Sequence, residues 1–153
     1  MRLKKRALMF FAFVAIAIIA GSSAIFVYFF LQPLSSAETA HRLNGIYTRT
    51  ANILRYMSDD MDSWANHTIS NSTFTTRMSD LKTDMTNVRA DLTALKRIAY
   101  PTYTESIDLL DSGLVACGYA LDYAQDFNFN QTLTYSEQAV EYLLRSARVM
   151  PTS

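Results

Sequence analysis

One stretch near the N-terminus limits what this chain can fold into more than any other feature does. Residues 7–31 carry no charge, and only the short patch at 21–23 interrupts their apolar run. A helix of that length extends over roughly 37 Å, which exceeds the hydrocarbon core of a bilayer, about 30 Å thick. The sequence therefore predicts a transmembrane helix over residues 7–32, preceded by a basic flank over residues 1–6.

A cleaved secretory signal is the competing interpretation of the same stretch. The basic flank and the small residues of 20–24 both suit a signal peptide. The apolar run resumes at 25–31, however, where a mature N-terminus is expected to become polar. We therefore favour a retained signal-anchor, and the N-terminal residue of the native protein separates the two interpretations.

Charge on the two sides of the run predicts its orientation. Four of residues 2–6 are Lys or Arg, whereas residues 32–40 contain neither. Positive charge stays on the cytoplasmic side, so we expect a single-pass protein of the cell membrane with residues 33–153 outside the cytoplasm. Without the four N-terminal cations, 10 of the 14 basic residues remain beside 14 acidic ones. Residues 33–153 are therefore expected to carry a negative net charge, which does not suit nucleic-acid binding.

Three Asn-x-Ser/Thr sequons agree with this orientation. They begin at Asn66, Asn71 and Asn130, each in a segment that we expect to be a loop. The motif is short and occurs often by chance, so a glycoprotein is a hypothesis here. Cys117 is the one cysteine, which excludes a disulfide within the chain.

Apolar residues after the run recur at alternating steps of four and three residues. Four segments show this spacing: 43–64, 74–99, 103–124 and 133–150. A period of 3.5 residues predicts helices that pack at a shallow angle with interlocking side chains, as in a coiled coil. In the last segment the pattern places Leu133, Val140 and Leu143 in the core, together with Ala147 and Met150.

Boundary signals divide these segments into helices. Capping boxes are predicted at Ser35-x-x-Glu38, Thr102-x-x-Glu105 and Thr134-x-x-Glu137, and prolines stand at 33, 101 and 151. The expected helices cover about 35–65, 73–99, 102–126 and 134–150. Their short connections predict an all-α, antiparallel, up-and-down bundle of four helices. Because the last helix is the shortest, one end of the bundle is expected to hold only three.

The segment 126–137 is the one motif with chemical content. Asp126, Asn128 and Asn130 stand at its first, third and fifth positions, and Glu137 at its twelfth. The pattern resembles the calcium loop of EF-hand proteins, and that resemblance implies a calcium ion held by these four residues. Gln131 stands where the family has a glycine. We favour the alternative, an ordinary connection between two helices.

Small residues indicate close helix packing at two places. Ala17, Gly21 and Ala24 share a face of the predicted span, which is typical of helices that associate in lipid. Gly113, Cys117 and Gly118, in the third predicted helix, suit close packing inside the bundle or a contact with another subunit. The sequence therefore predicts a protein partner or a homo-oligomer through one of these faces, in addition to membrane lipid.

The chain offers no nucleophile–base pair, phosphate loop or Gly-x-Ser-x-Gly motif, so we expect neither enzymatic activity nor a cofactor. The expected function is that of a non-catalytic accessory, scaffold or interaction subunit of a membrane or cell-surface assembly. Two alternatives stay open. The bundle resembles the outer domains of chemoreceptors, which implies ligand sensing through a partner. The segment 5–8 (KRAL) before a long apolar helix resembles the processing site of archaeal pilin precursors, which implies a filament subunit.

Overall fold

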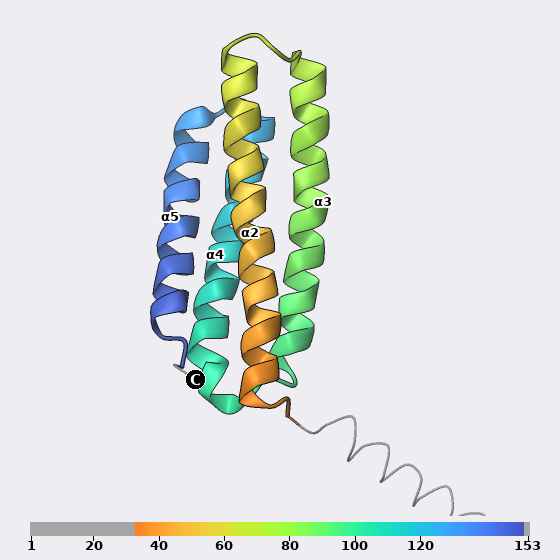
Figure 1. The fold of residues 1–153 in the computed structure, drawn as a ribbon. Helices are drawn as coiled ribbons and strands as arrows, with labels where there is room; N and C mark the ends of the chain where they lie inside the picture. The colour runs from red at the N-terminus through yellow and green to blue at the C-terminus, as the bar shows by residue number, and fades with distance from the viewer. Residues whose placement is uncertain (1–32, 152–153) are drawn as a thin grey trace, which may run out of the picture. The chain divides into compact units, whose positions relative to one another are not determined.

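The computed structural model describes residues 33–151, which form four α-helices joined by short connections. The helices are α2 (Ser36–Ala65), α3 (Asn71–Lys96), α4 (Thr104–Gln125) and α5 (Phe129–Arg148), and the short 3-10 helix η1 (Pro101–Tyr103) leads into α4. They run alternately up and down (Figure 1). The all-helical prediction is confirmed for this part of the chain, which contains no strand.

The predicted basic flank at 1–6 and the predicted membrane helix at 7–32 lie outside the described residues. Within residues 33–151, no helix is both long enough and apolar enough to cross a bilayer.

Hydroxyl side chains begin the first two helices, as their sequences favour. Ser35 caps α2 by accepting a hydrogen bond from the Glu38 backbone N–H at 3.2 Å. The Glu38 carboxylate pairs with Arg42 one turn later instead of completing the capping box. Ser70 caps α3 by accepting a hydrogen bond from the Thr73 N–H. The first capping site is therefore confirmed, although only its hydroxyl half is formed.

The two later capping boxes were predicted wrongly. Thr102 lies inside η1, and α4 begins without a side-chain cap because the turn at Pro101 leads directly into it. Thr134 lies inside α5, where its hydroxyl donates to the Asn130 carbonyl at 3.0 Å. Helix α5 begins at Phe129, five residues earlier than expected, because Asn128 caps it by accepting from the Gln131 N–H.

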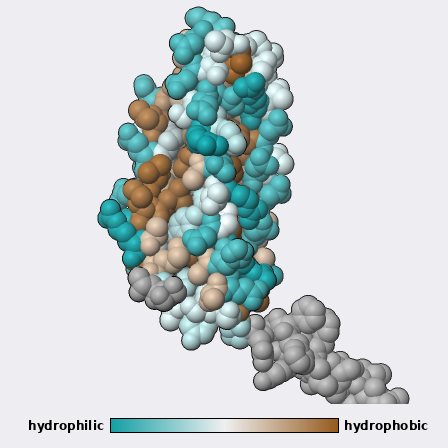
Figure 2. Space-filling model, in the orientation of Figure 1, coloured by the Kyte–Doolittle hydropathy of each residue, from teal (hydrophilic) through white to brown (hydrophobic). Residues whose placement is uncertain are grey.

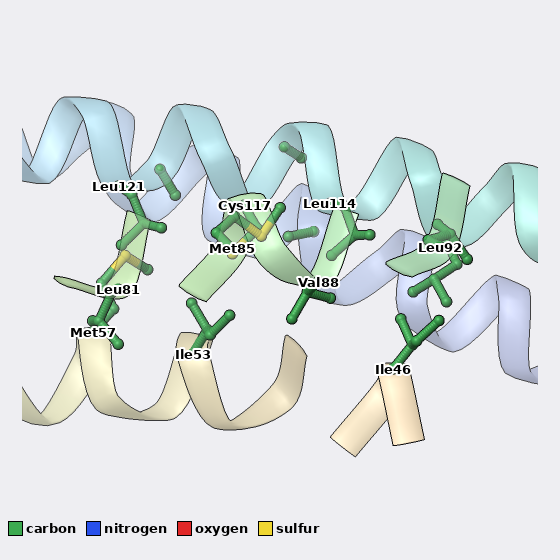
Figure 3. Packing of buried hydrophobic residues seen from close by; sticks show 14 of the residues in the cluster. Ile46, Ile53, Met57, Leu81, Met85, Val88, Leu92, Leu114, Cys117 and Leu121 are labelled. Atoms are coloured by element: carbon green, nitrogen blue, oxygen red, sulfur yellow. The ribbon is translucent and has the colours of Figure 1, made fainter. Parts of the chain in front are cut away.

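The core lies where the heptad spacing places it in the first three helices. Figure 3 shows side chains of α2, α3 and α4 meeting between the helix axes, among them Ile53, Val88 and Leu114. The predicted positions of α3 and α4 are buried throughout, apart from the partly buried Ala99 beyond the end of α3: Phe74, Met78, Leu81, Met85, Val88, Leu92, Leu95, Tyr103, Ile107, Leu110, Leu114, Cys117, Leu121 and Ala124.

Helix α5 packs mainly against α4, and small residues allow the two backbones to approach closely. A Cβ atom added to Gly113 would lie 3.2 Å from the Tyr142 Cβ and 3.4 Å from the Ala139 carbonyl oxygen. On α5, the buried positions are Thr132, Ala139 and Ser146, spaced by seven residues. Small side chains therefore face small side chains along this contact.

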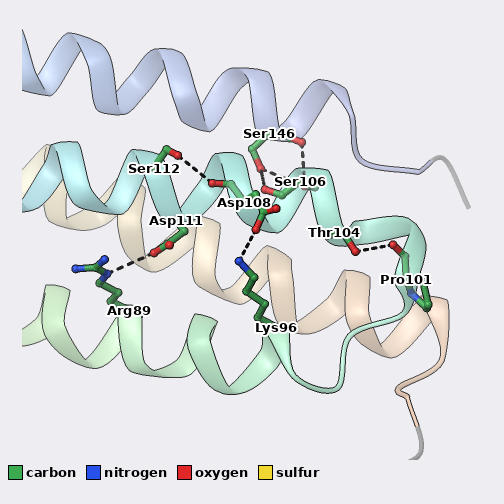
Figure 4. A network of polar contacts seen from close by, with 9 residues as sticks. All are labelled: Arg89, Lys96, Pro101, Thr104, Ser106, Asp108, Asp111, Ser112 and Ser146. Atoms are coloured by element: carbon green, nitrogen blue, oxygen red, sulfur yellow. Dashed lines mark hydrogen bonds and ion pairs between the residues drawn. The ribbon is translucent and has the colours of Figure 1, made fainter.

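Hydrogen bonds from serine hydroxyls to backbone carbonyls hold the same contact at its other end. The Ser106 hydroxyl donates to the Ser146 carbonyl at 3.0 Å, and the Ser146 hydroxyl donates to the Ser106 carbonyl (Figure 4). The Tyr47 hydroxyl of α2 reaches both serines. Every buried side-chain oxygen or nitrogen in the described part has a hydrogen-bond partner. Burial of these polar groups therefore costs little free energy of folding.

The core prediction for the last helix was wrong at three of its five residues, whereas Leu143 and Met150 are partly buried and pack against the core. Leu133, Val140 and Ala147 are exposed, whereas the buried heptad of α5 runs one position earlier. The physical reason lies in α4, where Gly113 lets Ala139 and Tyr142 of α5 approach at short distance. Larger aliphatic residues of α5 are thereby left beside the contact instead of in it.

Candidate functional site

The aliphatic residues that α5 leaves out of the core line a groove between α5 and α2. The groove has a volume of about 500 Å³. Leu133, Val140 and Leu144 form its α5 side, and Leu54, Met57 and Met61 form its α2 side. Figure 2 shows apolar side chains gathered on this face of the molecule, over the region where α5 and α2 lie next to each other in Figure 1.

Exposure is concentrated on the α5 side of this groove. Leu133 is 60% exposed, Leu144 54% and Val140 44%. In the described part of the chain, the only other exposed large aliphatic residue is Val149, the C-cap of α5. The remaining exposed large apolar residues are aromatic. A contiguous aliphatic face of this kind is characteristic of surfaces that bind another protein or a membrane.

The charges of α5 also differ from those of the other helices. Five ion pairs join different helices within residues 33–151, and all of them lie among α2, α3 and α4. Figure 4 shows two of these, from Lys96 and Arg89 of α3 to acidic residues of α4. The hydrogen bond to Asp108 raises the pKa of Lys96. Helix α5 forms one ion pair, within itself, between Glu141 and Arg145 at 3.9 Å, and both side chains are more than half exposed.

The two acidic residues of α5 precede its two basic residues. Glu137 and Glu141 lie along the groove, and Arg145 and Arg148 follow in the last turns. The C-terminal position of the two arginines complements the helix dipole, which favours cations there. The outer edge of the apolar face is therefore acidic at its start and basic at its end.

A second groove, between α3 and α4, is less suitable for a partner. Its volume is about 570 Å³, and Lys82, Arg89 and Asp122 are among the residues that line it. Lys82 pairs with Asp122, and Arg89 pairs with Asp111 at 3.4 Å. Its charges are already matched across the groove, so the α2–α5 groove is the stronger candidate.

The connection between α4 and α5 ends in an aromatic cluster. Phe127 has φ 56°, and the N–H groups of Phe127 and Asn128 donate to the carbonyls of Ala124 and Tyr123, which is the Schellman pattern of a helix C-terminus. The Phe127 ring lies 5.4 Å from Trp64 and 5.5 Å from Phe74. These contacts hold a non-glycine residue in the left-handed conformation and fix where α5 begins.

The four predicted calcium ligands do not form the twelve-residue loop of an EF-hand. Asp126 is the C-cap of α4 and Asn128 is the N-cap of α5, while Asn130 and Glu137 lie inside α5 about two turns apart. A calcium loop wraps its ligands around the ion, whereas a helix from residue 129 onward separates them along its axis. The alternative, an ordinary connection between two helices, agrees with this arrangement.

The sequon residues lie on the surface at three different places. Asn66 is the C-cap of α2, Asn71 is the first residue of α3, and Asn130 lies in the first turn of α5. All three are exposed. The expectation that each lies in a loop holds for Asn66 alone, and glycosylation stays a prediction.

The small residues of α4 fall into two groups. Gly113 and Cys117 are buried inside the bundle, so close packing, not a subunit contact, explains them. A Cβ added to Gly118 would meet nothing within 4 Å, and Gly118 lines the α3–α4 groove. Ala17, Gly21 and Ala24, the small residues of the predicted span, lie outside the described residues.

Burial gives Cys117 an unusual titration. It raises the pKa of the thiol from 9.0 to about 12. The unfolded chain releases this proton at lower pH than the folded one, so the stabilisation is complete below pH 9 and is lost as the pH rises toward 12. Between pH 8 and pH 11, the full-length wild-type protein is expected to lose more unfolding free energy than the Cys117→Ala variant does. The difference between the two losses should be on the order of 1 kcal/mol or more. Urea unfolding in detergent at the two pH values measures both. Equal losses in the two proteins would contradict this assignment.

Sequence reasoning missed the α2–α5 groove because two heptad patterns overlap in α5. Thr132, Ala139 and Ser146 repeat as regularly as Leu133, Val140 and Ala147 do. The signal that favours the first set is the run of small residues on the preceding helix, which requires small partners.

Comparison with known proteins finds no relative: no family model, no curated protein and no solved structure matches this chain.

Proposed function

We propose that this protein is a non-catalytic subunit that associates with protein through its helical bundle in a membrane or cell-surface assembly. Residues 7–32 would anchor it in the membrane, with residues 1–6 in the cytoplasm and the bundle outside. The observation that supports association is the aliphatic face of α5 at Leu133, Val140 and Leu144, which is left exposed beside a groove.

The chemistry of this face supports binding rather than catalysis. Aliphatic side chains contribute free energy by leaving water, at roughly 25 cal/mol per Å² of apolar surface, and they neither transfer protons nor hold charge. The two glutamates at the edge of the groove, Glu137 and Glu141, add orientation and selectivity to a partner. The anchor adds a second contribution, because copies held in one membrane meet at a higher effective concentration.

The association is tested with the full-length protein extracted in a mild detergent. Light scattering after size-exclusion chromatography is expected to give a protein mass above that of one chain, 17.3 kDa, and affinity purification from native membranes is expected to recover a defined complex. A monomer without a partner in both measurements would overturn the proposal. The orientation has its own test: protease added to intact cells should remove the bundle.

A filament subunit is the second candidate, and the segment KRAL at residues 5–8 is the observation that favours it. Processing there would leave a chain that begins at Ala7 with a long apolar helix, and the exposed face of α5 would then pack between subunits. Mass spectrometry of the native N-terminus separates the candidates. A chain that begins at Ala7 supports the filament, whereas an intact Met1 removes it and supports the anchor.

A further inference from the structure

We infer that the groove between α2 and α5 receives α5 of a second copy of this chain, packed antiparallel about a twofold axis. The inference rests on the proposed function, because it names the partner in that association. It is carried by the order of the charges along α5 and by the aliphatic face that they border.

In an antiparallel pair of α5 helices, each of the four charged residues of α5 lies opposite a residue of opposite charge. This arrangement places Glu137 opposite Arg148 of the second copy and Glu141 opposite Arg145 of the second copy. The same register places Val140 opposite Leu144 of the second copy, to within a fraction of a helical turn. Because the axis is twofold, each of these contacts occurs twice. A parallel pair would instead bring acid against acid and base against base.

The rest of the bundle explains why these charges are available to a second copy. Helices α2, α3 and α4 match their charges in five ion pairs with one another. Helix α5 takes part in none of them, and its internal pair at 3.9 Å is too long and too exposed to contribute much. The acidic pair and the basic pair of α5 are thus each other's complement in an antiparallel arrangement, and two copies of this chain supply both.

The length of the contact between the two α5 helices determines how tightly the dimer is expected to associate. In this register the two helices overlap from Glu137 to Arg148, which covers about three turns, or about 16 Å, of a helix that is about 30 Å long. Stable dimers commonly bury about 800 Å² per partner, which a contact centred on three turns approaches only with help from the flanking side chains. We therefore expect a reversible dimer in detergent, with dissociation in the micromolar range.

Charge exchange within α5 tests the inference directly. One full-length variant carries Glu137→Arg and Glu141→Arg, and the other carries Arg145→Glu and Arg148→Glu. Each variant alone brings like charges together in the antiparallel pair, so its dimer is expected to be at least about tenfold weaker by sedimentation equilibrium. Mixed in equal amounts, the two variants regain complementary charges and should form a heterodimer, visible by native mass spectrometry. The variant with all four changes should dimerise like the wild type.

The matched control is the pair Asp80→Arg and Asp84→Arg. These two exposed acids are also four residues apart, but they lie on α3. This control should leave the dimer unchanged, and circular dichroism checks that every variant keeps its helices.

The outcomes distinguish failure of the inference from failure of the proposed function. An oligomer that neither exchanged variant weakens overturns the role of α5 and leaves the proposed association standing. Variants that are each weakened but do not recover on mixing show that the α5 helices of two copies do not pair with each other, which overturns the antiparallel arrangement. A wild-type chain that stays monomeric at every concentration overturns the inference, and only the added absence of a partner in native membranes overturns the proposed function.

Discussion

Replacement of Phe74 by alanine is expected to lower the free energy of unfolding by about 3–4 kcal/mol, the range usual for a large aromatic removed from a core. Phe74 has no exposed surface, and its ring lies 5.9 Å from Trp64, 5.5 Å from Phe127 and 6.1 Å from Phe129. The cavity would therefore open where the α2–α3 and α4–α5 connections meet. Urea unfolding of the full-length protein in detergent, followed by circular dichroism, measures the loss.

An exposed aromatic provides the control for Phe74. Tyr119 is 50% exposed, and its ring lies 5.3 Å from that of Tyr135. Tyr119→Ala is expected to cost less than about 1 kcal/mol, because it removes one aromatic pair and leaves no closed cavity. If Phe74→Ala were no more destabilising than Tyr119→Ala, the aromatic cluster would not hold this end of the bundle together.

The same cluster links stability to the proposed dimer. Phe127 keeps its left-handed backbone at φ 56° while its ring packs on Phe74, and Asn128 begins α5 directly afterwards. Loss of the Phe74 ring should therefore loosen the first turn of α5, next to Leu133. Hydrogen exchange of the Thr132 amide, which donates to the Asn128 carbonyl, would show this loosening before global unfolding.

Much of the fold was predictable because two helices repeat their apolar residues without ambiguity. In α3 every step of the heptad is a large apolar residue and most of its neighbours are polar, so only one face can be buried; in α4 every step of the heptad is also apolar. The start of α2 was also predictable, because a hydroxyl residue directly before an apolar periodic segment satisfies the free N–H groups of the first turn.

The last helix was not predictable in the same way, and the candidate site depends on it. Two faces of α5 repeat every seven residues. The face with Leu133 and Val140 carries the larger apolar side chains, so α5 considered alone favours that face as the core. Only the neighbour decides between them: Gly113 and Ser106 on α4 contact Ala139 and Ser146, which therefore face inward. The groove thus follows from pairwise packing, which one helix considered alone does not contain.

The capping signal of α5 was present in the sequence but was outweighed by a stronger pattern. Asn128-x-x-Gln131 has the form of a helix start, and the structure uses it. Thr134-x-x-Glu137 has the same form, and together with the oxygen donors of 126–137 it favoured a longer connection. The tight Schellman turn at Phe127 favours the earlier helix start, because it reverses the chain within three residues and α5 can begin directly after it.

Gly113 is the residue on which the position of α5 most depends. The Tyr142 Cβ and the Ala139 carbonyl oxygen of α5 would lie only 3.2 and 3.4 Å from a Cβ at this position, so a side chain longer than a methyl group does not fit between the helices. Both of those atoms belong to the backbone of α5 or are attached to it, so rotation of a side chain cannot make room. Any large residue at 113 must push α5 away from α4, and the hydrogen bonds between Ser106 and Ser146 must lengthen with it.

We therefore expect Gly113→Leu to destabilise the full-length protein by about 3 kcal/mol, the upper part of the usual range for overpacking, and to weaken self-association as α5 moves. Urea unfolding and sedimentation equilibrium measure the two effects. Gly118→Ala is the matched control on the same helix: its Cβ meets nothing within 4 Å, so relief of the glycine penalty should raise stability by about 1 kcal/mol and leave association unchanged. If Gly113→Leu proved as stable as the wild type, α5 would not be held against α4 by close backbone contact, and the exposure of Leu133, Val140 and Leu144 would lose its structural cause.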